Sequence, residues 1–129
     1  MKALLDTHFL LWLVAGAPRL QEYDWLPGYR PWGVSPLSLL EVHYLAERGR
    51  LRVDATALRE AIDADPWFHV DDPPLLPVCR HAFELSWTRD PFDRLLAGHS
   101  LARRVPLITA DRRIRQNHAF LPPELPRLG

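Results

Sequence analysis

The sequence predicts an α/β fold, a three-layer arrangement in which helices flank both faces of a central parallel sheet. Short apolar runs alternate along the chain with longer segments of helical periodicity, which is typical of such a sheet. Two of the runs end in an aspartate, at Leu4-Leu5-Asp6 and at Leu107-Ile108-Thr109-Ala110-Asp111. The residue after a parallel strand lies at the edge where these sheets bind ligands. Acidic side chains are therefore expected together at that edge.

The first half of the chain alternates strand and helix. Ser35 is a suitable N-cap and Pro36 suits the first helical position, so a helix with an apolar face is expected behind them. That face is formed by Leu39, Leu40, Val42 and Leu45. The expected elements are a strand at 2–5, a helix at 7–14 ended by Gly16 and Pro18, an irregular or weakly helical connection at 19–31, a strand at 32–34 and a helix at 36–48 ended by Gly49.

The second half repeats the pattern. Either Asp54 or Thr56 is expected to cap a helix that turns Leu58, Ala61 and Ile62 inward and ends before Pro66. The elements expected after it are a strand at 67–70, a proline-rich loop at 71–77, a helix at 78–85, a helix at 91–102 capped by Asp90 and a strand at 105–109. A chain of 129 residues is suited to a single domain over residues 1–129.

The net charge does not indicate a polyanionic or membrane partner, because 16 basic and 16 acidic residues cancel. All but one of the basic residues are arginine, and several are clustered. Arginine matches phosphate in a bidentate manner, so the clusters are candidates for guiding a polyanion, although for any single cluster a solvated helix face is the simpler reading. The clusters are Arg48, Arg50 and Arg52; Arg103 and Arg104; and Arg112, Arg113 and Arg115.

The chain is expected in the cytoplasm, with no membrane segment. Its lone Cys79 cannot form an internal disulfide, which fits a reducing compartment. Residues 1–17 imitate a signal peptide, but Asp6 and His8 interrupt the apolar region that such a peptide needs. The remaining apolar run at 9–15 is too short to span a bilayer.

The strand-end acids raise an electrostatic problem that a cation would solve. Asp6, Asp93 and Asp111 would repel one another at one edge of the sheet unless a positive charge held them. Glu41 interrupts the apolar face of its helix, where a carboxylate needs a partner. Alone it would be read as a helix acid paired with an arginine, but the three aspartates favour a place with them.

Asp90 and Asp93 flank the start of one predicted helix, where the helix dipole favours negative charge. Asp90 is interpreted first as the N-cap and second as a metal ligand, whereas Asp93, in the first turn, is favoured as a ligand. Arg94 is a candidate to hold a carboxylate or to meet a phosphate, with a surface salt bridge as the alternative.

Four motifs of the chain occur in an order and spacing that one known family shares. They are Leu4-Leu5-Asp6-Thr7-His8, the helix start from Ser35 to Glu41, Asp90-Pro91-Phe92-Asp93-Arg94-Leu95-Leu96 and Leu107-Ile108-Thr109-Ala110-Asp111. Together they resemble the successive motifs of PIN-domain proteins of the VapC toxin type, over nearly the whole chain. One strand ending in Asp is a weak signal, but four motifs in this order are specific.

The resemblance implies a Mg2+- or Mn2+-dependent endoribonuclease, the toxin of a type II toxin–antitoxin pair. It also implies an acidic centre of Asp6, Glu41, Asp93 and Asp111, with Asp90 as a further metal ligand. Hard divalent cations take oxygen ligands, and a bound cation lowers the pKa of a water and offsets charge on a phosphodiester. The implied partners are an RNA substrate, an antitoxin and a second copy of the chain in a homodimer.

Neighbouring side chains are assigned supporting roles. Thr7 and Thr109 adjoin strand-end acids, so their hydroxyls are candidates to orient a carboxylate or a metal-bound water; a strand-end or helix-cap role is the alternative. His8 and His99 lie near acidic motifs and are candidates to touch a substrate, but a packed or surface histidine is the simpler reading of each. The chain departs from the common family pattern at Ala97-Gly98-His99, where many relatives carry a larger apolar residue followed by Ala and Gln.

Other functions compete less well. The main alternative is a catalytically silent PIN-like module that binds RNA or protein. A phosphatase is weaker, because position 8 is His and the Asp-x-Asp nucleophile arrangement is missing. A zinc site lacks a second ligand pair of the right spacing beside Cys79-Arg80-His81, and the chain has neither a glycine-rich phosphate loop nor a Gly-x-Ser-x-Gly turn.

Overall fold

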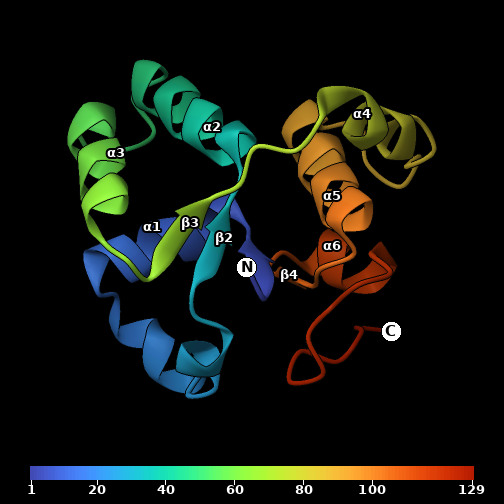
Figure 1. Cartoon of the computed structure of the whole chain (residues 1–129), viewed down its shortest axis with the longest axis horizontal. Coiled ribbons are helices and arrows are strands. Elements are labelled where there is room, and N and C mark those ends of the chain that lie inside the picture. Colours follow the sequence, from blue (N-terminus) through green and yellow to red (C-terminus); the bar gives the residue numbers. More distant parts are fainter.

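The computed structural model of the protein describes residues 1–129 as a four-stranded sheet with helices on both faces (Figure 1). All neighbouring strands run parallel, in the order β3-β2-β1-β4. The predicted three-layer α/β/α fold class is therefore confirmed. The strands are β1 (Ala3–Leu5), β2 (Trp32–Val34), β3 (Phe68–Val70) and β4 (Leu107–Ile108).

Five α-helices and two short 3₁₀ helices connect the strands, and a sixth α-helix follows the last strand. The 3₁₀ helices η1 (Pro18–Glu22) and η2 (Leu26–Tyr29) occupy the connection expected to be irregular or weakly helical. None of the helices has the length and apolar character needed to cross a bilayer. The α-helices are α1 (Thr7–Ala15), α2 (Pro36–Glu47), α3 (Ala55–Ala64), α4 (Leu75–Phe83), α5 (Pro91–Arg103) and α6 (Arg112–Asn117).

The strand order explains why the helices form two layers. The chain first moves outward from β1 to β2 and β3, then returns past β1 to place β4 on its other side. Right-handed crossovers in opposite directions put their helices on opposite faces of a sheet. In Figure 1, α2 and α3 accordingly lie on one side of the strands and α4 and α5 on the other. The reversal makes the boundary between β1 and β4 the topological switch point of the sheet.

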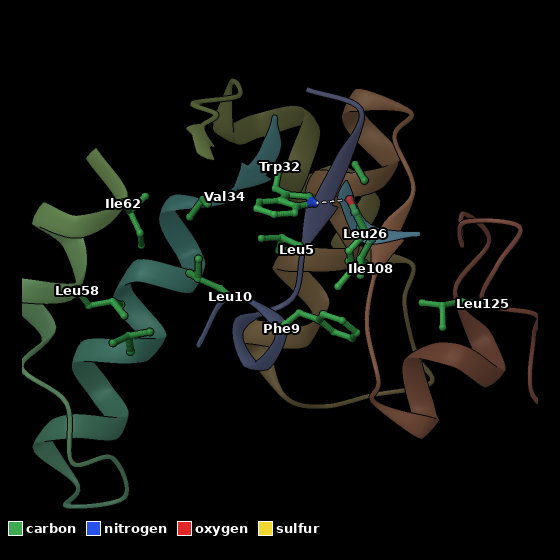
Figure 2. Packing of buried hydrophobic residues seen from close by; sticks show 12 residues of the cluster. Leu5, Phe9, Leu10, Leu26, Trp32, Val34, Leu58, Ile62, Ile108 and Leu125 are labelled. Carbon is green, nitrogen blue, oxygen red and sulfur yellow. Dashed lines mark hydrogen bonds between the residues drawn. The ribbon is translucent and has the colours of Figure 1, made fainter. Parts of the chain in front are cut away.

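Alternate residues of the strands feed two separate apolar clusters. Leu5 belongs to a cluster of 12 buried residues that joins the sheet to α1, α2 and α3 (Figure 2). Its neighbour Leu4 points to the other face and packs with Leu107, Leu96 of α5 and Ile114 of α6. Because successive strand side chains point to opposite faces, a strand of three residues contributes side chains to the apolar clusters on both faces of the sheet. The near-continuous apolar runs in the sequence follow from this two-sided burial.

Side-chain caps start the helices at the positions that the sequence predicts. Ser35, Asp54 and Asp90 each accept a hydrogen bond from the backbone N–H two residues ahead, at 3.2, 3.0 and 2.8 Å. Asp54 rather than Thr56 is thus the cap of α3. At the other end of α1, Gly16 adopts a left-handed conformation with φ of 64°, which suits a residue without a Cβ.

Three local expectations were wrong. α4 begins at Leu75 rather than at 78, because Pro77 is tolerated in a first helical turn, where its missing N–H needs no partner. Leu40 is 58% exposed, and Ala61 is exposed as well, so neither belongs to an inward helix face. The short helix α6, capped by Asp111, follows β4 where no helix was expected.

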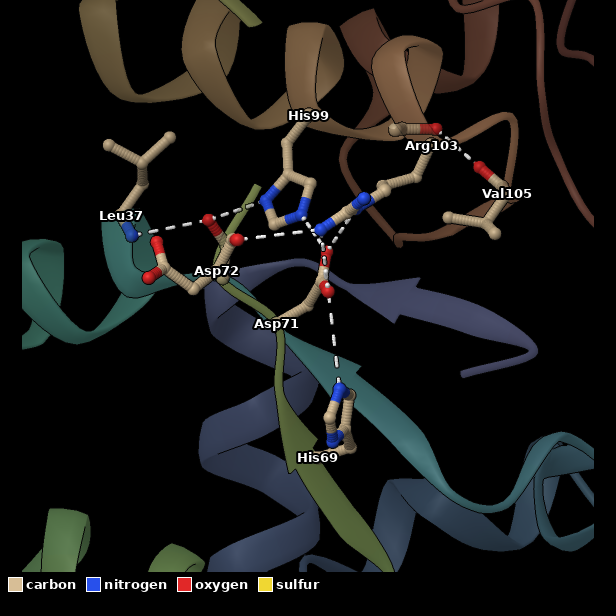
Figure 3. A network of polar contacts seen from close by, with 9 residues as sticks. Leu37, His69, Asp71, Asp72, His99, Arg103 and Val105 are labelled. Atoms are coloured by element: carbon tan, nitrogen blue, oxygen red, sulfur yellow. Dashed lines mark hydrogen bonds and ion pairs between the residues drawn. The ribbon is translucent and has the colours of Figure 1, made fainter. Parts of the chain in front are cut away.

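A polar network anchors α5 to the ends of β2 and β3 (Figure 3). Asp71, just after β3, accepts hydrogen bonds from His99 Nε2 at 2.8 Å and from Arg103 Nε at 2.8 Å. His99 Nδ1 lies 2.9 Å from the hydroxyl of Ser35, which caps α2. Because a carboxylate only accepts, the network assigns the proton to Nε2 and leaves Nδ1 to accept from Ser35. One buried imidazole therefore joins α5, β3 and the start of α2.

Burial and hydrogen bonds together determine the protonation states of Asp71 and His99. Burial raises the pKa of Asp71, but hydrogen bonds from Arg103 and His99 outweigh it and hold that pKa below its usual value. Burial lowers the pKa of His99, and the nearby Asp71 reverses only part of this change. A neutral imidazole thus faces an ionised carboxylate that Arg103 neutralises. The packed-histidine reading of His99 is the one that the structure bears out.

Close packing of α4 on α5 requires a glycine at position 98. A Cβ added there would lie 2.5 Å from the carbonyl oxygen of Val78 and 3.4 Å from the Cβ of Ala82. A backbone carbonyl inside a helix cannot move away cheaply, so any side chain at this position would force the two helices apart. Gly98 and His99, where the chain departs from the common family pattern, are thus explained by packing.

We expect Gly98→Ala to lower the free energy of unfolding by about 1–3 kcal/mol, although alanine favours helices, because the new methyl group overpacks the contact between α4 and α5. Gly28→Ala is the matched control, since a Cβ at Gly28 would meet nothing within 4 Å. Urea unfolding of both variants measures the difference. Equal midpoints for the two variants would contradict this account of Gly98.

His118 makes stability depend on pH. Its side chain is 1% exposed, and burial, with Arg127 nearby, lowers its pKa from 6.5 to about 4. Its Nε2 lies 2.9 Å from Ser100 Oγ, whose hydroxyl donates to the carbonyl of Val105, so Nε2 carries the proton; Nδ1 is buried without a partner. Acid protonates the unfolded chain first, so stability is fully present above pH 6.5 and falls towards pH 4.

We expect this histidine alone to account for about 2 kcal/mol of lost stability between pH 7.5 and pH 5. His118→Gln, which keeps an N–H donor for Ser100 but does not titrate, should lose correspondingly less over the same interval. Urea unfolding of the two proteins at both pH values gives the comparison, and other titrating groups cancel in it. The same pH dependence in both proteins would exclude His118 as the source.

Candidate metal centre

One pocket collects the acidic side chains that the sequence singles out. It has a volume of about 140 Å³ and opens at the carboxyl edge of the sheet, between the ends of β1 and β4 and the starts of α5 and α6. Five of its nine lining residues are carboxylates, and two apolar side chains complete it from α5 and α6. We call it the acidic pocket; it is lined by Asp6, Thr7, His8, Glu41, Asp90, Asp93, Leu96, Asp111 and Ile114.

Asp6 is the most deeply placed of the five carboxylates, with 4% of its surface exposed. It follows the central strand β1 and is the N-cap of α1, so its Oδ1 accepts a hydrogen bond from the N–H of Phe9 at 2.9 Å. Its Oδ2 accepts a hydrogen bond from the hydroxyl of Thr109. Each oxygen is thus held by one donor, which fixes the orientation of the carboxylate at the switch point.

Thr109 connects the two strands at this point. Its hydroxyl donates to Asp6 and accepts a hydrogen bond from the N–H of Asp111 at 2.9 Å. Asp111 in turn caps α6, its Oδ1 accepting from the N–H of Ile114 at 3.0 Å. One fully buried threonine therefore positions two acids that are 105 residues apart in the chain.

Glu41 reaches the acidic pocket from the middle of α2. Its Oε1 accepts a hydrogen bond from the hydroxyl of Thr7 at 2.5 Å, across 34 residues of chain. Thr7 is 3% exposed and directly follows Asp6, so the end of β1 holds the carboxylate that α2 supplies. The hydroxyl of Thr7 orients a carboxylate, as one of its two sequence-based readings expects.

Asp90 and Asp93 occupy the start of α5. Asp90 caps the helix, with its Oδ1 accepting from the N–H groups of Phe92 at 2.8 Å and of Asp93 at 3.2 Å. Asp90 is exposed at the rim, whereas Asp93 is partly buried, and the side chain of Asp93 makes no hydrogen bond to the protein. The cap role of Asp90 is confirmed, and Asp93 presents its carboxylate unpaired to the pocket.

The environment of the pocket raises the pKa values of two of its acids, Asp93 and Asp6. Partial burial and then the charges of Asp90, Asp111, Glu41 and Asp6 raise the pKa of Asp93 from 3.8 to about 7. Burial also raises the pKa of Asp6, against the lowering effect of the hydrogen bonds from Phe9 and Thr109. No basic residue except His8 lines the pocket, so the protein itself leaves this negative charge uncompensated.

The donor set fits a hard divalent cation. The carboxylates offer oxygen ligands alone, which Mg2+ and Mn2+ prefer, and no cysteine lines the pocket. No three His, Cys, Asp or Glu side chains are arranged as a ready-made ligand cage. An ionised carboxylate has about four lone-pair positions, however, so the acids that already accept a protein hydrogen bond keep free positions for a cation or for its waters.

Arg94 lies away from the acidic pocket, whereas His8 is a surface residue beside it. Arg94 does not line the acidic pocket: its Nε donates to the carbonyl of Ala82 at 3.1 Å and its Nη2 to that of Phe83 at 3.2 Å, so it caps the end of α4. His8, read as a packed or surface residue, is exposed and lines the pocket. Its position in the first turn of α1, two residues after Asp6, was the available signal.

The comparisons with known proteins agree with this geometry. The family model described as the PIN domain matches residues 3–119, which is most of the chain. No curated protein matches the sequence significantly. The PIN domain is generally a nuclease fold, and its nucleases usually use divalent metals. A parallel sheet with carboxylates collected at its switch point, together with this match, shows that the chain belongs to the PIN-domain family.

Proposed function

We propose that the protein is a divalent-metal-dependent endoribonuclease that hydrolyses RNA phosphodiester bonds. The observation that carries the proposal is the convergence of five carboxylates from β1, α2, α5 and the end of β4 on one open pocket. A cluster of like charges is costly to maintain, and the side chain of Asp93 has no protein hydrogen bond to offset that cost. A cation and a phosphate explain the arrangement.

The residues divide the work by position. Asp6, Glu41, Asp93 and Asp111 would hold Mg2+ or Mn2+, with Asp90 at the rim as a further ligand. When bound, the cation supplies a water of lowered pKa and offsets negative charge on the phosphate. Thr7 and Thr109 keep Glu41 and Asp6 in fixed orientations through their hydroxyl groups.

The finer assignment is a VapC-type toxin that acts in the cytoplasm. It is supported by the four motifs, and it brings two proposed partners, an antitoxin and a second copy of the chain. Exposed apolar side chains supply surface that a partner would bury, namely Leu40 of α2 and Leu75, Leu76 and Phe83 of α4. A small open reading frame directly upstream that encodes a DNA-binding protein would support the toxin assignment, and light scattering of the purified protein measures the dimer.

The alternative function is a PIN-like module that binds RNA or protein without cutting it. All four acids of the expected centre are present and reach the same pocket, which favours the enzyme. The two functions differ in one measurable respect, since a silent module binds RNA with no product formed in any metal.

We expect Asp6→Asn and Asp93→Asn each to reduce RNA cleavage in Mg2+ or Mn2+ by about 100-fold or more, because each removes a charge that holds the cation. Asp63→Asn, on the exposed face of α3, is the matched control and should cleave like the wild type. Gel analysis of a labelled unstructured RNA gives the rates, and circular dichroism verifies that the variants fold. Cleavage that persists in both variants, or in excess chelator, would refute the proposal.

We expect Thr109→Val to reduce cleavage by about 10- to 100-fold, because it removes the hydroxyl that orients Asp6 and bonds to the N–H of Asp111. Thr109→Ser keeps the hydroxyl and should restore most of the activity. The measured quantity is the metal concentration that gives half-maximal cleavage. It should rise in Thr109→Val and be close to the wild-type value in Thr109→Ser. A valine variant with unchanged metal dependence would reduce Thr109 to a packing role.

A further inference from the structure

A second pocket opens beside the acidic pocket and shares two of its carboxylates. It has a volume of about 240 Å³, and Glu41 and Asp90 line both pockets, so the two are adjacent. The chemistry changes at this boundary, because the far side of the second pocket is basic and aromatic instead of acidic. We call it the basic–aromatic pocket; its distinguishing side chains are Tyr44, Arg48, Arg50 and Phe92.

We propose that the basic–aromatic pocket is a nucleotide subsite for single-stranded RNA, adjacent to the phosphate that is cleaved. Tyr44 and Phe92 would receive the base, while Arg48 and Arg50 would bind the phosphate that follows. The inference rests on the proposed function, because it takes the acidic pocket as the place of the scissile phosphate. It names the part of the surface that holds the substrate strand there.

Helical periodicity places both pockets along a single stripe of α2. The side chains that follow Glu41 by three, four and seven residues lie on the same face of the helix as Glu41; they are Tyr44, Leu45 and Arg48. All four line the basic–aromatic pocket. Glu41 at one end of the stripe also lines the acidic pocket. A strand that follows this face would pass from carboxylates to an aromatic ring and then to a guanidinium group.

The aromatic side chains form a platform at the junction of α2 and α5. The rings of Tyr44 and Phe92 lie 5.7 Å apart at a tilt of 37°. Tyr44 is 41% exposed and Phe92 is partly exposed, so both rings offer surface to a ligand. Bases stack on such rings with little dependence on sequence, because every base has a π-face. Phe92 is also held by its position two residues after the cap Asp90.

The two arginines are free to bind an anion. The ion pairs of the structure all involve Asp71, so neither Arg48 nor Arg50 is neutralised by a carboxylate. Arg48 is instead held by Tyr44, whose hydroxyl accepts from its Nη1 at 2.8 Å and whose ring centre lies 5.6 Å from its guanidinium carbon. Arg50 follows Gly49, which adopts a left-handed conformation with φ of 68° and turns the chain after α2. Both guanidinium groups are exposed beside the pocket.

The charge distribution favours RNA over an acidic protein partner as the occupant. An acidic peptide would bring further carboxylates towards Glu41, Asp90 and Asp93, where the negative charges already repel one another. An RNA strand combines a phosphate for the arginines with a flat base for the rings, and its next phosphate is the group that a cation-loaded acidic pocket attracts. One ligand class thus matches both pockets in the order in which they occur.

The test measures binding of a fluorescent, unstructured RNA 10-mer in excess chelator, where binding is read apart from cleavage. We expect the double variant Arg48→Ala/Arg50→Ala to raise the Kd about 10-fold and to reduce the slope of log Kd against log salt by about 0.7, since the two arginines share one phosphate and each lost phosphate contact on a single strand removes about 0.7. Tyr44→Leu should raise the Kd about 5- to 100-fold, whereas Tyr44→Phe keeps the ring and loses only the hydrogen bond to Arg48, so it should raise the Kd by a much smaller factor.

Arg59→Ala is the matched control, because Arg59 is an exposed arginine on α3 that lines neither pocket. If the double variant binds RNA as tightly as this control, with the same salt slope, the subsite is overturned, and cleavage by the wild type would still uphold the proposed function. If binding depends on the pocket but no metal supports cleavage, the subsite stands and the proposed function fails. Thermal melting of every variant verifies folding.

Steady-state kinetics in Mg2+ separate substrate binding from assembly of the metal centre. The double arginine variant should raise KM about 10-fold and change kcat much less, because the side chains contact RNA away from the acidic pocket. A fall in kcat with unchanged KM would show that these arginines act on the metal centre, and would overturn the subsite.

Discussion

The arrangement of the whole site depends on one buried carboxylate at the end of the central strand. Asp6 is nearly inaccessible to water, and burial raises its pKa, yet two donors from different parts of the chain hold it in place. One donor is the backbone of α1 and the other is the hydroxyl that follows β4. Burying a carboxyl group without these hydrogen bonds would cost free energy. The burial of Asp6 is therefore favourable only when the ends of β1 and β4 come together. The other acids are arranged around this fixed point.

The sequence predicts best where a local rule and the global fold agree. Strands β1 and β2, the caps Ser35 and Asp90 and the end of α1 at Gly16 each depend on a few neighbouring residues, and all were found as expected. The strand-end aspartates could be located for the same reason. Their collection in one pocket follows from parallel strands sharing an edge, which needs only the α/β fold class.

The expectations failed where the outcome depends on a distant partner. Leu40 matches the apolar periodicity of α2 as well as Val42 does, but no other element covers it. Arg94 sits between two acidic motifs in the sequence, whereas its guanidinium group turns to the carbonyls that end α4. The packed reading of His99 is correct, but its partners could not be named from the sequence, because they are 64 and 28 residues away. Each case needs tertiary contacts that periodicity does not contain.

The strand order also determines when the centre can exist during synthesis. β4 is the last strand of the chain but pairs with the first. The hydrogen bond from Thr109 to Asp6 therefore cannot form until the residues between them have been synthesised. A nascent chain that ends before residue 107 contains Asp6, Glu41 and Asp93 without the strand that completes the pocket. Contacts across such long stretches of sequence form late in folding. An incomplete chain therefore carries most of the acids but not the assembled centre.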